Sequence, residues 1–197
     1  MRVISGRFKG MALTTPKAGT RPTTDRTKEA IFSHLDSWGV LDDARVLDLF
    51  AGTGALGIEA LSRGARELVA VESSAPAAAL IAQTLTALKH NRSWEHGMSA
   101  RVVKARAEKY AASASAVEPF DMVFIDPPYA FETNDCNQLL ADLASRELTS
   151  SNTVIMLERS TRSEAPMAPA NWEITDRRDY GETAVYYIEP SEPIAES

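Results

Sequence analysis

The stretch 45–60, RVLDLFAGTGALGIEA, combines a short apolar run, a glycine-rich loop and a second apolar run. Its glycines, Gly52, Gly54 and Gly57, have the spacing G-x-G-x-x-G, and Glu72 follows at the end of the next apolar run. In a unit of strand, loop and helix, this arrangement is typical of a nucleotide-cofactor site at the carboxyl end of a parallel strand. The stretch therefore predicts an α/β fold with such a site.

Apolar runs and helical patterns alternate through most of the chain. The predicted strands occupy 45–50, 67–72, 101–104, 120–126 and 154–158, and the helices between them occupy 55–63, 75–89, 108–114 and 136–145. This alternation is typical of a doubly wound parallel sheet. A further helix should begin at Thr24 or Asp25, either of which could cap it. Two strands within 172–190 are joined directly, so we expect an antiparallel pair at the sheet edge.

Asp48 distinguishes between two kinds of cofactor for the glycine loop. It lies just before the loop, where the pyrophosphate of NAD would approach the helix N-terminus, and a carboxylate there repels a dianion. S-adenosylmethionine, which carries an ammonium and a sulfonium group, is attracted instead. Glu72 fits either ligand, because a carboxylate at this position can accept hydrogen bonds from ribose hydroxyls. The loop favours S-adenosylmethionine, and an NAD-dependent oxidoreductase is the alternative.

The stretch 120–132, FDMVFIDPPYAFE, ends an apolar run with an acid, two prolines and a tyrosine. Pro127 and Pro128 donate no backbone hydrogen bond, so they stop the strand and keep the chain extended. Asp126 and the carbonyl group of Pro127 could accept hydrogen bonds from the exocyclic amine of a base. Tyr129 offers a ring on which that base can stack. Fixed acceptors would aim the nitrogen lone pair at a methyl group, which suggests methyl transfer to a base amine.

The net charge of −6 is unevenly distributed. Residues 1–30 contain seven basic and two acidic residues (+5), whereas the rest of the chain contains fourteen basic and twenty-five acidic residues (−11). This asymmetry predicts a basic N-terminal arm on an acidic body, and such an arm is typical of proteins that bind nucleic acid.

Composition excludes several classes of protein. Cys136 is the single cysteine, so no internal disulfide forms, and we expect an inert thiol and a cytoplasmic protein. No apolar run approaches the ~20 residues of a membrane helix, so no membrane partner is expected. The histidines at positions 34, 90 and 96 show no metal-ligand pattern, and we expect no metal.

Together these stretches resemble a known family. DLFAGTGALGIEALSRGA followed by DPPY is similar to class I methyltransferases that act on base amines. MRVISGRFKG, RPTTDRTKEAIFS and NWEITDRRDYGETAVYY follow the pattern of the RsmD family, bacterial 16S rRNA guanine-N2 methyltransferases. The resemblance covers nearly the whole chain. It implies a Rossmann-like α/β fold with a seven-stranded, mostly parallel sheet whose last strand is antiparallel, and a small N-terminal β-hairpin.

The resemblance also implies where the site lies. The predicted catalytic tetrad is Asp126, Pro127, Pro128 and Tyr129. The predicted donor site comprises Asp48, Ala51, Gly52, Thr53, Gly54, Glu72 and Ser73, with Ala107 and Glu108 near the adenine because they follow the third predicted strand. The residues expected to contact RNA are Arg7, Lys9, Arg21, Arg26 and Lys28.

The resulting hypothesis is a monomeric enzyme that methylates guanine N2 in 16S rRNA, within a 30S particle or an assembly intermediate. Residues 1–24 would form the basic hairpin extension, 25–190 the methyltransferase domain and 191–197 a flexible tail. The tetrad alone leaves open an adenine-N6 methyltransferase that acts on DNA or RNA. A non-catalytic RNA-binding module would leave the intact donor loop unexplained.

Overall fold

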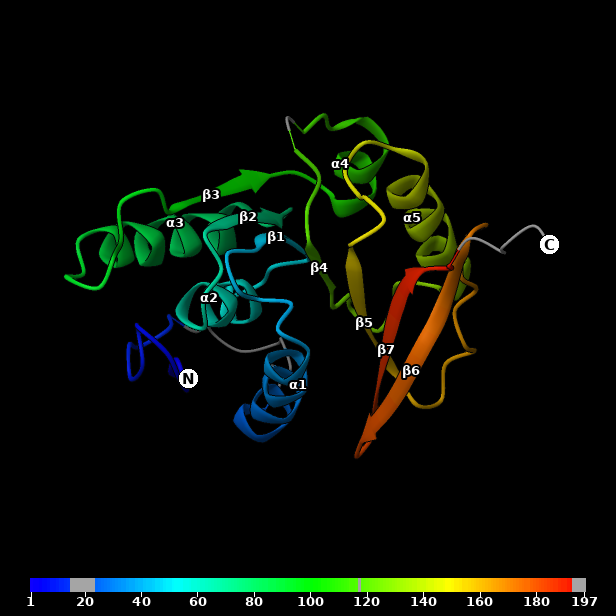
Figure 1. Ribbon diagram of the computed structural model, residues 1–197, viewed down its shortest axis with the longest axis horizontal. Helices are drawn as coiled ribbons and strands as arrows, with labels where there is room; N and C mark the ends of the chain where they lie inside the picture. Colours follow the sequence, from blue (N-terminus) through cyan, green and yellow to red (C-terminus); the bar gives the residue numbers. More distant parts are fainter. Residues whose placement is uncertain (15–23, 117, 193–197) are drawn as a thin grey trace.

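The computed structural model describes residues 1–14, 24–116 and 118–192. Within these residues a seven-stranded sheet has the order β3-β2-β1-β4-β5-β7-β6 (Figure 1). The strands are β1 (Arg45–Leu49), β2 (Glu67–Glu72), β3 (Ser99–Lys104), β4 (Met122–Ile125), β5 (Val154–Ser160), β6 (Trp172–Tyr180) and β7 (Thr183–Pro190). Only β7 runs antiparallel to its neighbours, β5 and β6. The predicted class I fold is confirmed, and β6 is the outer strand of the antiparallel pair at the edge.

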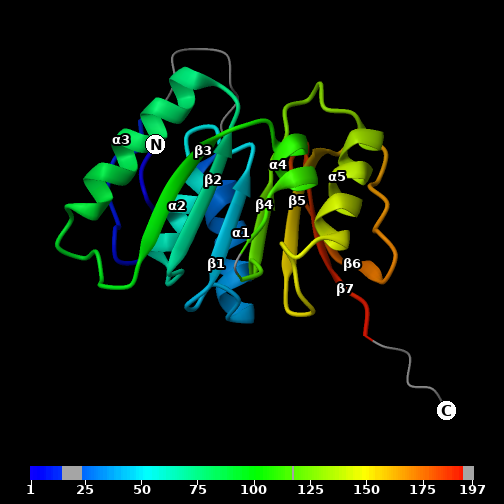
Figure 2. The ribbon, with the colours of Figure 1, turned by 90° about the horizontal axis from the view of Figure 1, so that it is seen from above.

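Helices cover both faces of the sheet (Figure 2). The first face carries α1 (Asp25–Trp38), α2 (Ala55–Ser62) and α3 (Ala75–Lys89), and the second carries α4 (Ala107–Ser113) and α5 (Thr133–Ser145). Each face buries its own apolar cluster against the sheet, with α1–α3 in one cluster and α4–α5 in the other. Among the described residues, no helix combines the length and apolar character needed to cross a bilayer.

Local caps explain where two of the helices begin. The Thr24 hydroxyl accepts a hydrogen bond from the amide of Thr27 at 3.2 Å, as the sequence predicted for the start of α1. The Ser74 hydroxyl caps α3 in the same way, through the amide of Ala77. A left-handed Gly39 at φ 68° ends α1.

The largest differences from the sequence-based bounds are at β3, β4, β5 and α5; β4 begins at Met122, two residues after its predicted start. β5 continues to Ser160 because its antiparallel partner β7 pairs with it there. β3 begins at Ser99 because β2 pairs with it from Glu67 onward. Both extensions depend on a partner strand, which local sequence does not reveal. Helix α5 begins at Thr133, three residues before the predicted start.

Residues 1–14 turn back on themselves in a minimal hairpin, in which the amide of Val3 donates to the carbonyl oxygen of Met11 and that of Leu13 to Met1, but they do not project as an arm. Their two sides meet in a single antiparallel bridge between Arg2 and Ala12. Val3, Phe8 and Leu13 are buried in the cluster beneath α1–α3, so the segment is part of the core (Figure 1). The sequence predicted an extension, because the polar residues and glycines between these three apolar residues gave no sign that the three are buried.

The backbone of this segment is bound to α2. The amide of Ile4 donates to Glu59 Oε1 at 2.9 Å, and the amide of Phe8 donates to the Ser62 hydroxyl at 2.9 Å. Gly6 has φ 89°, and a Cβ there would lie 2.0 Å from the carbonyl oxygen of Ser62. Glycine is therefore required at this contact.

The loop between α3 and β3 also holds the N-terminal segment. Trp94 packs against Phe8 with ring centroids 6.3 Å apart. Arg7 Nη1 lies 3.3 Å from Glu95 Oε1 and donates to Met98 Sδ at 3.2 Å. The stretch 91–100 thus forms part of the support for residues 1–14.

Candidate active site

The glycine loop connects β1 to α2 and is fixed by backbone hydrogen bonds. The amide of Gly52 donates to Glu72 Oε1 at 2.9 Å, and the amide of Ala51 donates to the carbonyl oxygen of Val71 at 2.9 Å. Gly52 and Gly54 have φ of 60° and 79°, which favours glycine at both positions. A Cβ at Gly57 would lie 2.5 Å from Leu68 Cδ1, so the third glycine lets α2 approach β2. Each glycine of the motif therefore has a structural role.

Glu72 closes this loop from the end of β2. Besides Gly52, its carboxylate accepts the amide of Ser74 at 2.6 Å. A carboxylate has about four lone-pair positions, so two bonds to the backbone leave room for ribose hydroxyls. The predicted ribose contact stays a prediction, and the structure adds a second task for Glu72, which is to hold the loop.

Asp48 lies beneath the loop and is buried. Its Oδ2 accepts the amide of Gly57 at 3.1 Å. Burial raises the pKa of Asp48 to about 8; the Gly57 hydrogen bond lowers it, and the charges of Asp126 and Glu72 raise it further. Three carboxyl groups therefore lie within electrostatic reach of one another, and a cation bound among them would relieve their repulsion.

Strand register explains how these acids come together. Leu49 at the end of β1 pairs with Val71 of β2 on one side and with Ile125 of β4 on the other. Glu72 and Asp126 follow those partners directly, so the ends of three neighbouring strands are level. Side chains alternate along a strand, and Asp48, Glu72 and Asp126 share the face that α1–α3 cover. The strand order reverses between β1 and β4, and ligands of such sheets bind at that switch point.

The acceptor candidates lie in the connection from β4 to α5. Asp126 and Pro127 are half-buried, whereas Tyr129 is 67% exposed. The amide of Phe131 donates to the carbonyl oxygen of Pro128 at 2.9 Å and closes a turn that carries Tyr129. β4 ends at Ile125, one residue before the predicted end at Asp126, and the two prolines follow.

Two aromatic residues near the site were not predicted. Phe50, between β1 and the loop, has φ 59°, and for a bulky residue this conformation costs roughly 1–3 kcal/mol. Its ring meets that of Phe131 at 5.0 Å and 67°. A phenylalanine that directly precedes a glycine loop gives no local sign of a strained backbone, so the sequence did not reveal the pair.

The remaining predicted donor residues lie at the same edge. Ala107 is the buried first residue of α4, and Glu108 pairs with Arg106 at 3.0 Å. Thr53 accepts the amide of Ala55 at 3.3 Å, and Ser73 is exposed after β2. Within the described parts of the chain, no group of three or more histidine, cysteine or acidic side chains could hold a metal ion.

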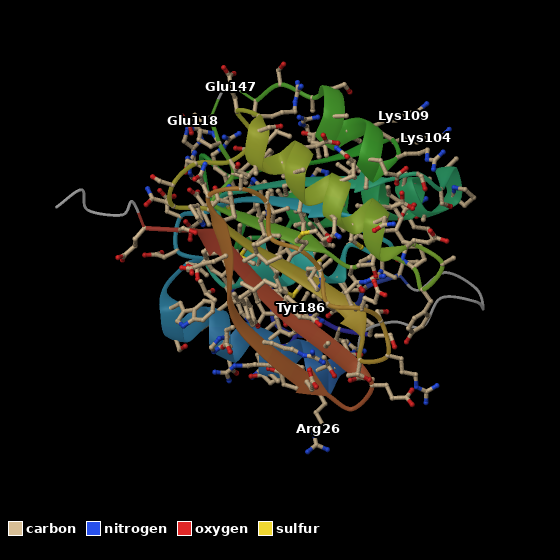
Figure 3. The ribbon with its side chains drawn as sticks, turned by 90° about the vertical axis from the view of Figure 1, so that its right-hand side faces the viewer. Arg26, Lys104, Lys109, Glu118, Glu147 and Tyr186 are labelled. Atoms are coloured by element: carbon tan, nitrogen blue, oxygen red, sulfur yellow. The ribbon has the colours of Figure 1, made fainter. Side chains whose placement is uncertain are left out.

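The predicted RNA contacts separate into different groups. Lys28 cannot contact RNA because its side chain is fully buried and donates to the carbonyl oxygen of Arg2 at 3.0 Å. Arg7 is largely buried and paired with Glu95. Lys9 and Arg26 are exposed, and Arg26 projects outward from α1 in Figure 3. Arg21 lies outside the described residues. Of the described candidates, Lys9 and Arg26 are the accessible ones.

Exposed cations also occur at the β3 edge, where the sequence analysis placed none. Lys104 and Lys109 are both exposed, and both point away from the body in Figure 3. Lys104 pairs in register with Glu72, so it lies at the carboxyl edge beside the donor loop. The charge count took residues 31–197 together. Their net charge is −11, so the two lysines did not stand out.

Known proteins match this chain over nearly its whole length. A family described as "Conserved hypothetical protein 95" matches residues 1–189. The chain is 33% identical over 185 residues to Ribosomal RNA small subunit methyltransferase D of Escherichia coli K12, which covers 93% of this chain and 87% of that protein. It is 34% identical over 187 residues to YlbH of Bacillus subtilis, covering 94% and 96%. The chain belongs to the RsmD family. The resemblance seen in its motifs is confirmed.

Solved structures of the family share the fold. The Escherichia coli protein yhhF superimposes with a TM-score of 0.82 at 32% identity, covering 97% of this chain and 98% of that chain. The Thermus thermophilus protein TTHA0928 gives a TM-score of 0.76 at 32% identity, covering 96% and 99%. Magnesium protoporphyrin IX methyltransferase from Synechocystis, solved with bound S-adenosylmethionine, gives 0.62 at 14% identity, covering 88% and 87%, and therefore supports the fold alone.

Asp48→Asn should stabilise the ligand-free protein at alkaline pH and weaken the binding of S-adenosylmethionine. The pKa of Asp48 is about 8 in the folded protein and near 4 unfolded, so ionisation costs stability progressively between about pH 4 and pH 8. Asparagine avoids this cost and can still accept the Gly57 amide. The excess melting temperature of the variant should therefore grow over this range and level off above it. S-adenosylmethionine should bind roughly 10- to 150-fold more weakly above pH 8.

Thermal unfolding and calorimetry across this pH range would measure both effects. Glu67→Gln is a control, because Glu67 pairs with Arg45 at the amino end of β2, and its carboxyl pKa is lowered by that partner. A pH-independent difference between Asp48→Asn and wild type would show that the carboxyl of Asp48 does not titrate in this way.

Proposed function

We propose that the protein transfers a methyl group from S-adenosylmethionine to the N2 amine of a guanine in 16S rRNA. The observation that carries the proposal is the register of the three neighbouring strands. It places Asp126, directly after β4, level with the start of the glycine loop after β1 and with Glu72 at the end of β2. A methyl donor in the loop and an amine at Asp126 would then lie at neighbouring strand ends. The names of family members support ribosomal RNA of the small subunit as the substrate.

The donor loop has the charge and shape that S-adenosylmethionine requires. Glu72 and Asp126 provide negative charge for its ammonium and sulfonium groups. The pKa of Asp48 is raised to about 8 by burial and, to a smaller extent, by the charges of Asp126 and Glu72, so a bound cation would favour its ionisation. The positive φ of Gly52 and Gly54 turns the backbone sharply. Because both residues are glycines, the loop has no side chain at these two positions. When bound, the donor supplies an electrophilic methyl group. The same carboxyl groups would repel the pyrophosphate of NAD.

The acceptor side of the reaction relies on three groups. Asp126 and the carbonyl oxygen of Pro127 accept hydrogen bonds from the two N–H groups of the amine. These bonds aim the nitrogen lone pair at the methyl carbon. As the carbon–nitrogen bond forms, the bond between the methyl carbon and the donor sulfur breaks, so positive charge passes from the sulfur to the nitrogen. Asp126 stabilises that charge and takes the released proton. Tyr129 stacks on the base, a contact worth roughly 1–3 kcal/mol. The prolines keep these acceptors in place before the substrate arrives.

Guanine N2, rather than adenine N6, is supported by the motifs that accompany the tetrad. D-P-P-Y is compatible with either amine, whereas RPTTDR and the C-terminal NWEITDRRDYGETAVYY are shared with the family of guanine enzymes that this chain resembles. The proposed organisation keeps 25–190 as the methyltransferase domain and 1–24 as a segment that contacts RNA, with Val3, Phe8 and Leu13 packed into the core of that domain. The proposed substrate is a 30S particle bound by a cytoplasmic monomer.

Nucleoside analysis would test this proposal. Purified protein, S-adenosylmethionine labelled on its methyl group and 30S particles from a strain without the enzyme should yield N2-methylguanosine in 16S rRNA. Mass spectrometry would distinguish this product from N6-methyladenosine, which would indicate the adenine alternative. Tight binding of NAD without methyl transfer would contradict the proposal as a whole.

Reversing the charge of exposed cations should weaken RNA binding without affecting the donor. Lys9→Glu, Arg26→Glu and Lys104→Glu should each reduce 30S affinity, because a protein that neutralises one phosphate fewer releases fewer counterions on binding. The slope of log affinity against log salt should decrease by about 1 for each phosphate that is no longer neutralised. Filter binding across a salt series measures this, and calorimetry with S-adenosylmethionine is the control for the donor site.

Arg177→Glu is the matched control, because Arg177 lies on β6 at the far edge and is paired with Asp179 at 2.9 Å. If all four variants bind particles with the wild-type salt slope, RNA is held by other residues.

A further inference from the structure

Two phenylalanines join the donor loop to the acceptor turn. Phe50 begins the glycine loop, and Phe131 ends the turn that carries Tyr129. Their rings meet nearly edge-to-face, with centroids 5.0 Å apart and planes at 67°, a favoured aromatic geometry. Both rings are half-buried and pack against the apolar cluster beneath α4 and α5. The donor loop and the acceptor turn, which are assigned to different ligands, therefore pack together as one unit.

Phe131 fixes the turn on which Tyr129 sits. Its amide donates to the carbonyl oxygen of Pro128 at 2.9 Å, which closes the four residues 128–131. The Tyr129 side chain is 67% exposed, so little packing of its own orients the ring. The direction of that ring depends on the backbone of the turn, and the turn is anchored by the Pro127–Pro128 pair on one side and by Phe131 on the other.

Phe50 is held in a conformation that ties it to the loop. Its φ of 59° is unfavourable for a bulky side chain, and such outliers persist where the surroundings enforce them. On its other side, Ala51 is bonded to Val71 and Gly52 to Glu72. Relaxation of Phe50 out of the left-handed region would move its ring relative to Phe131. The strained residue therefore connects the position of the glycine loop to the position of the turn.

We propose that Phe131, held by Phe50, is a positioning residue for methyl transfer. The pair fixes the ring of Tyr129 relative to the donor methyl group. This inference rests on the proposed function, because it takes Tyr129 as the base-stacking residue. Neither phenylalanine contacts the reacting atoms in this scheme; each acts through the turn.

A double-mutant cycle with Tyr129 tests the assignment. Phe131→Ala should lower kcat for 30S methylation roughly 10- to 100-fold through misplacement, with an unchanged dissociation constant for S-adenosylmethionine. In a Tyr129→Ala background the same substitution should cost little more, because the residue through which it acts is already absent. Phe131→Tyr keeps the ring and should recover most of the wild-type kcat.

Trp172→Ala is the matched control. Trp172 packs against the same cluster, but it lies at the amino end of β6, on the opposite edge from both loops. It should lower the melting temperature and leave kcat and the Tyr129 cycle unchanged. If Phe131→Ala proves too unstable, Phe131→Leu keeps the apolar volume without the edge-to-face contact and should show a smaller loss of the same kind.

The outcomes separate this inference from the proposed function. If wild-type protein fails to methylate 30S particles, the proposed function is wrong. If wild type is active and the Phe131 and Tyr129 losses multiply independently, or Phe131→Ala retains the wild-type kcat, the positioning role is wrong. A decrease in melting temperature alone, matched by Trp172→Ala, would reduce Phe131 to a packing residue.

Discussion

Asp126→Ala should abolish most methyl transfer, with a decrease in kcat of roughly 10²–10⁴-fold. In the proposed reaction this carboxylate stabilises the positive charge that develops on the amine and accepts its proton, and no other acid follows β4 at that level. The binding of S-adenosylmethionine should change much less than activity, because Asp48 and Glu72 remain at the donor loop. Single-turnover methylation of 30S particles and donor calorimetry would measure the two quantities separately.

Asp126→Asn is the informative companion variant. It keeps an oxygen acceptor but neither the negative charge nor the capacity to take a proton, so its activity should lie between those of wild type and alanine. The pKa of Asp48 should also move downward in both variants, because the charge of Asp126 helps to raise it. An Asp126→Ala enzyme with wild-type kcat would remove the acceptor assignment altogether, whatever the donor affinity.

Much of the site could be predicted because its parts are local in sequence. A strand that ends in an acid, in two prolines or in a glycine loop marks its own carboxyl edge, and parallel strands bring those edges together. Asp48, Glu72 and Asp126 therefore lie where the sequence predicted. Their spatial order follows from β1 lying between β2 and β4, which is a property of the fold family.

The role of the N-terminal region could not be predicted in the same way. Arg7 and Lys28 look like members of a basic arm because both are cations near the start of the chain. Their partners, Glu95 and Glu59, lie far away in sequence and are brought close by packing. A count of charges per segment cannot distinguish a cation that is paired inside the protein from one that faces solvent.

Cys136 illustrates the opposite situation, in which composition sufficed. The thiol is buried, and burial raises its pKa, so the reactive thiolate is disfavoured. The sequence predicted an inert cysteine because nothing accompanied it in a catalytic pattern. A cysteine without a catalytic pattern around it in the sequence is readily interpreted as inert. The role of a lysine or arginine depends on partners that only the fold brings close.

Lys28→Met should destabilise the fold by about 3–5 kcal/mol, the usual cost of leaving a buried charge without its partner. Lys28 Nζ lies 4.0 Å from Glu59 Oε1, and both side chains are inaccessible to solvent. Burial lowers the pKa of Lys28 and raises the pKa of Glu59, so the lysine depends on the carboxylate to remain charged inside the protein. Glu59 also has Arg63 Nη2 at 3.7 Å from the same Oε1, so it would lose one of two cationic neighbours. The melting temperature should fall by roughly 6–20 °C.

The same substitution separates a structural role for Lys28 from the RNA contact first expected of it. Folded Lys28→Met protein, assayed well below its melting temperature, should bind 30S particles with the wild-type salt slope. Adding Glu59→Gln should recover part of the missing stability, because no uncompensated carboxylate then remains beneath residues 1–14. Arg26→Ala, two positions earlier on the exposed side of α1, should change stability by no more than about 0.5 kcal/mol. If Lys28→Met kept the wild-type melting temperature but had a reduced affinity for particles, the lysine would have to leave the interior to reach RNA, and its assignment to the core would be wrong.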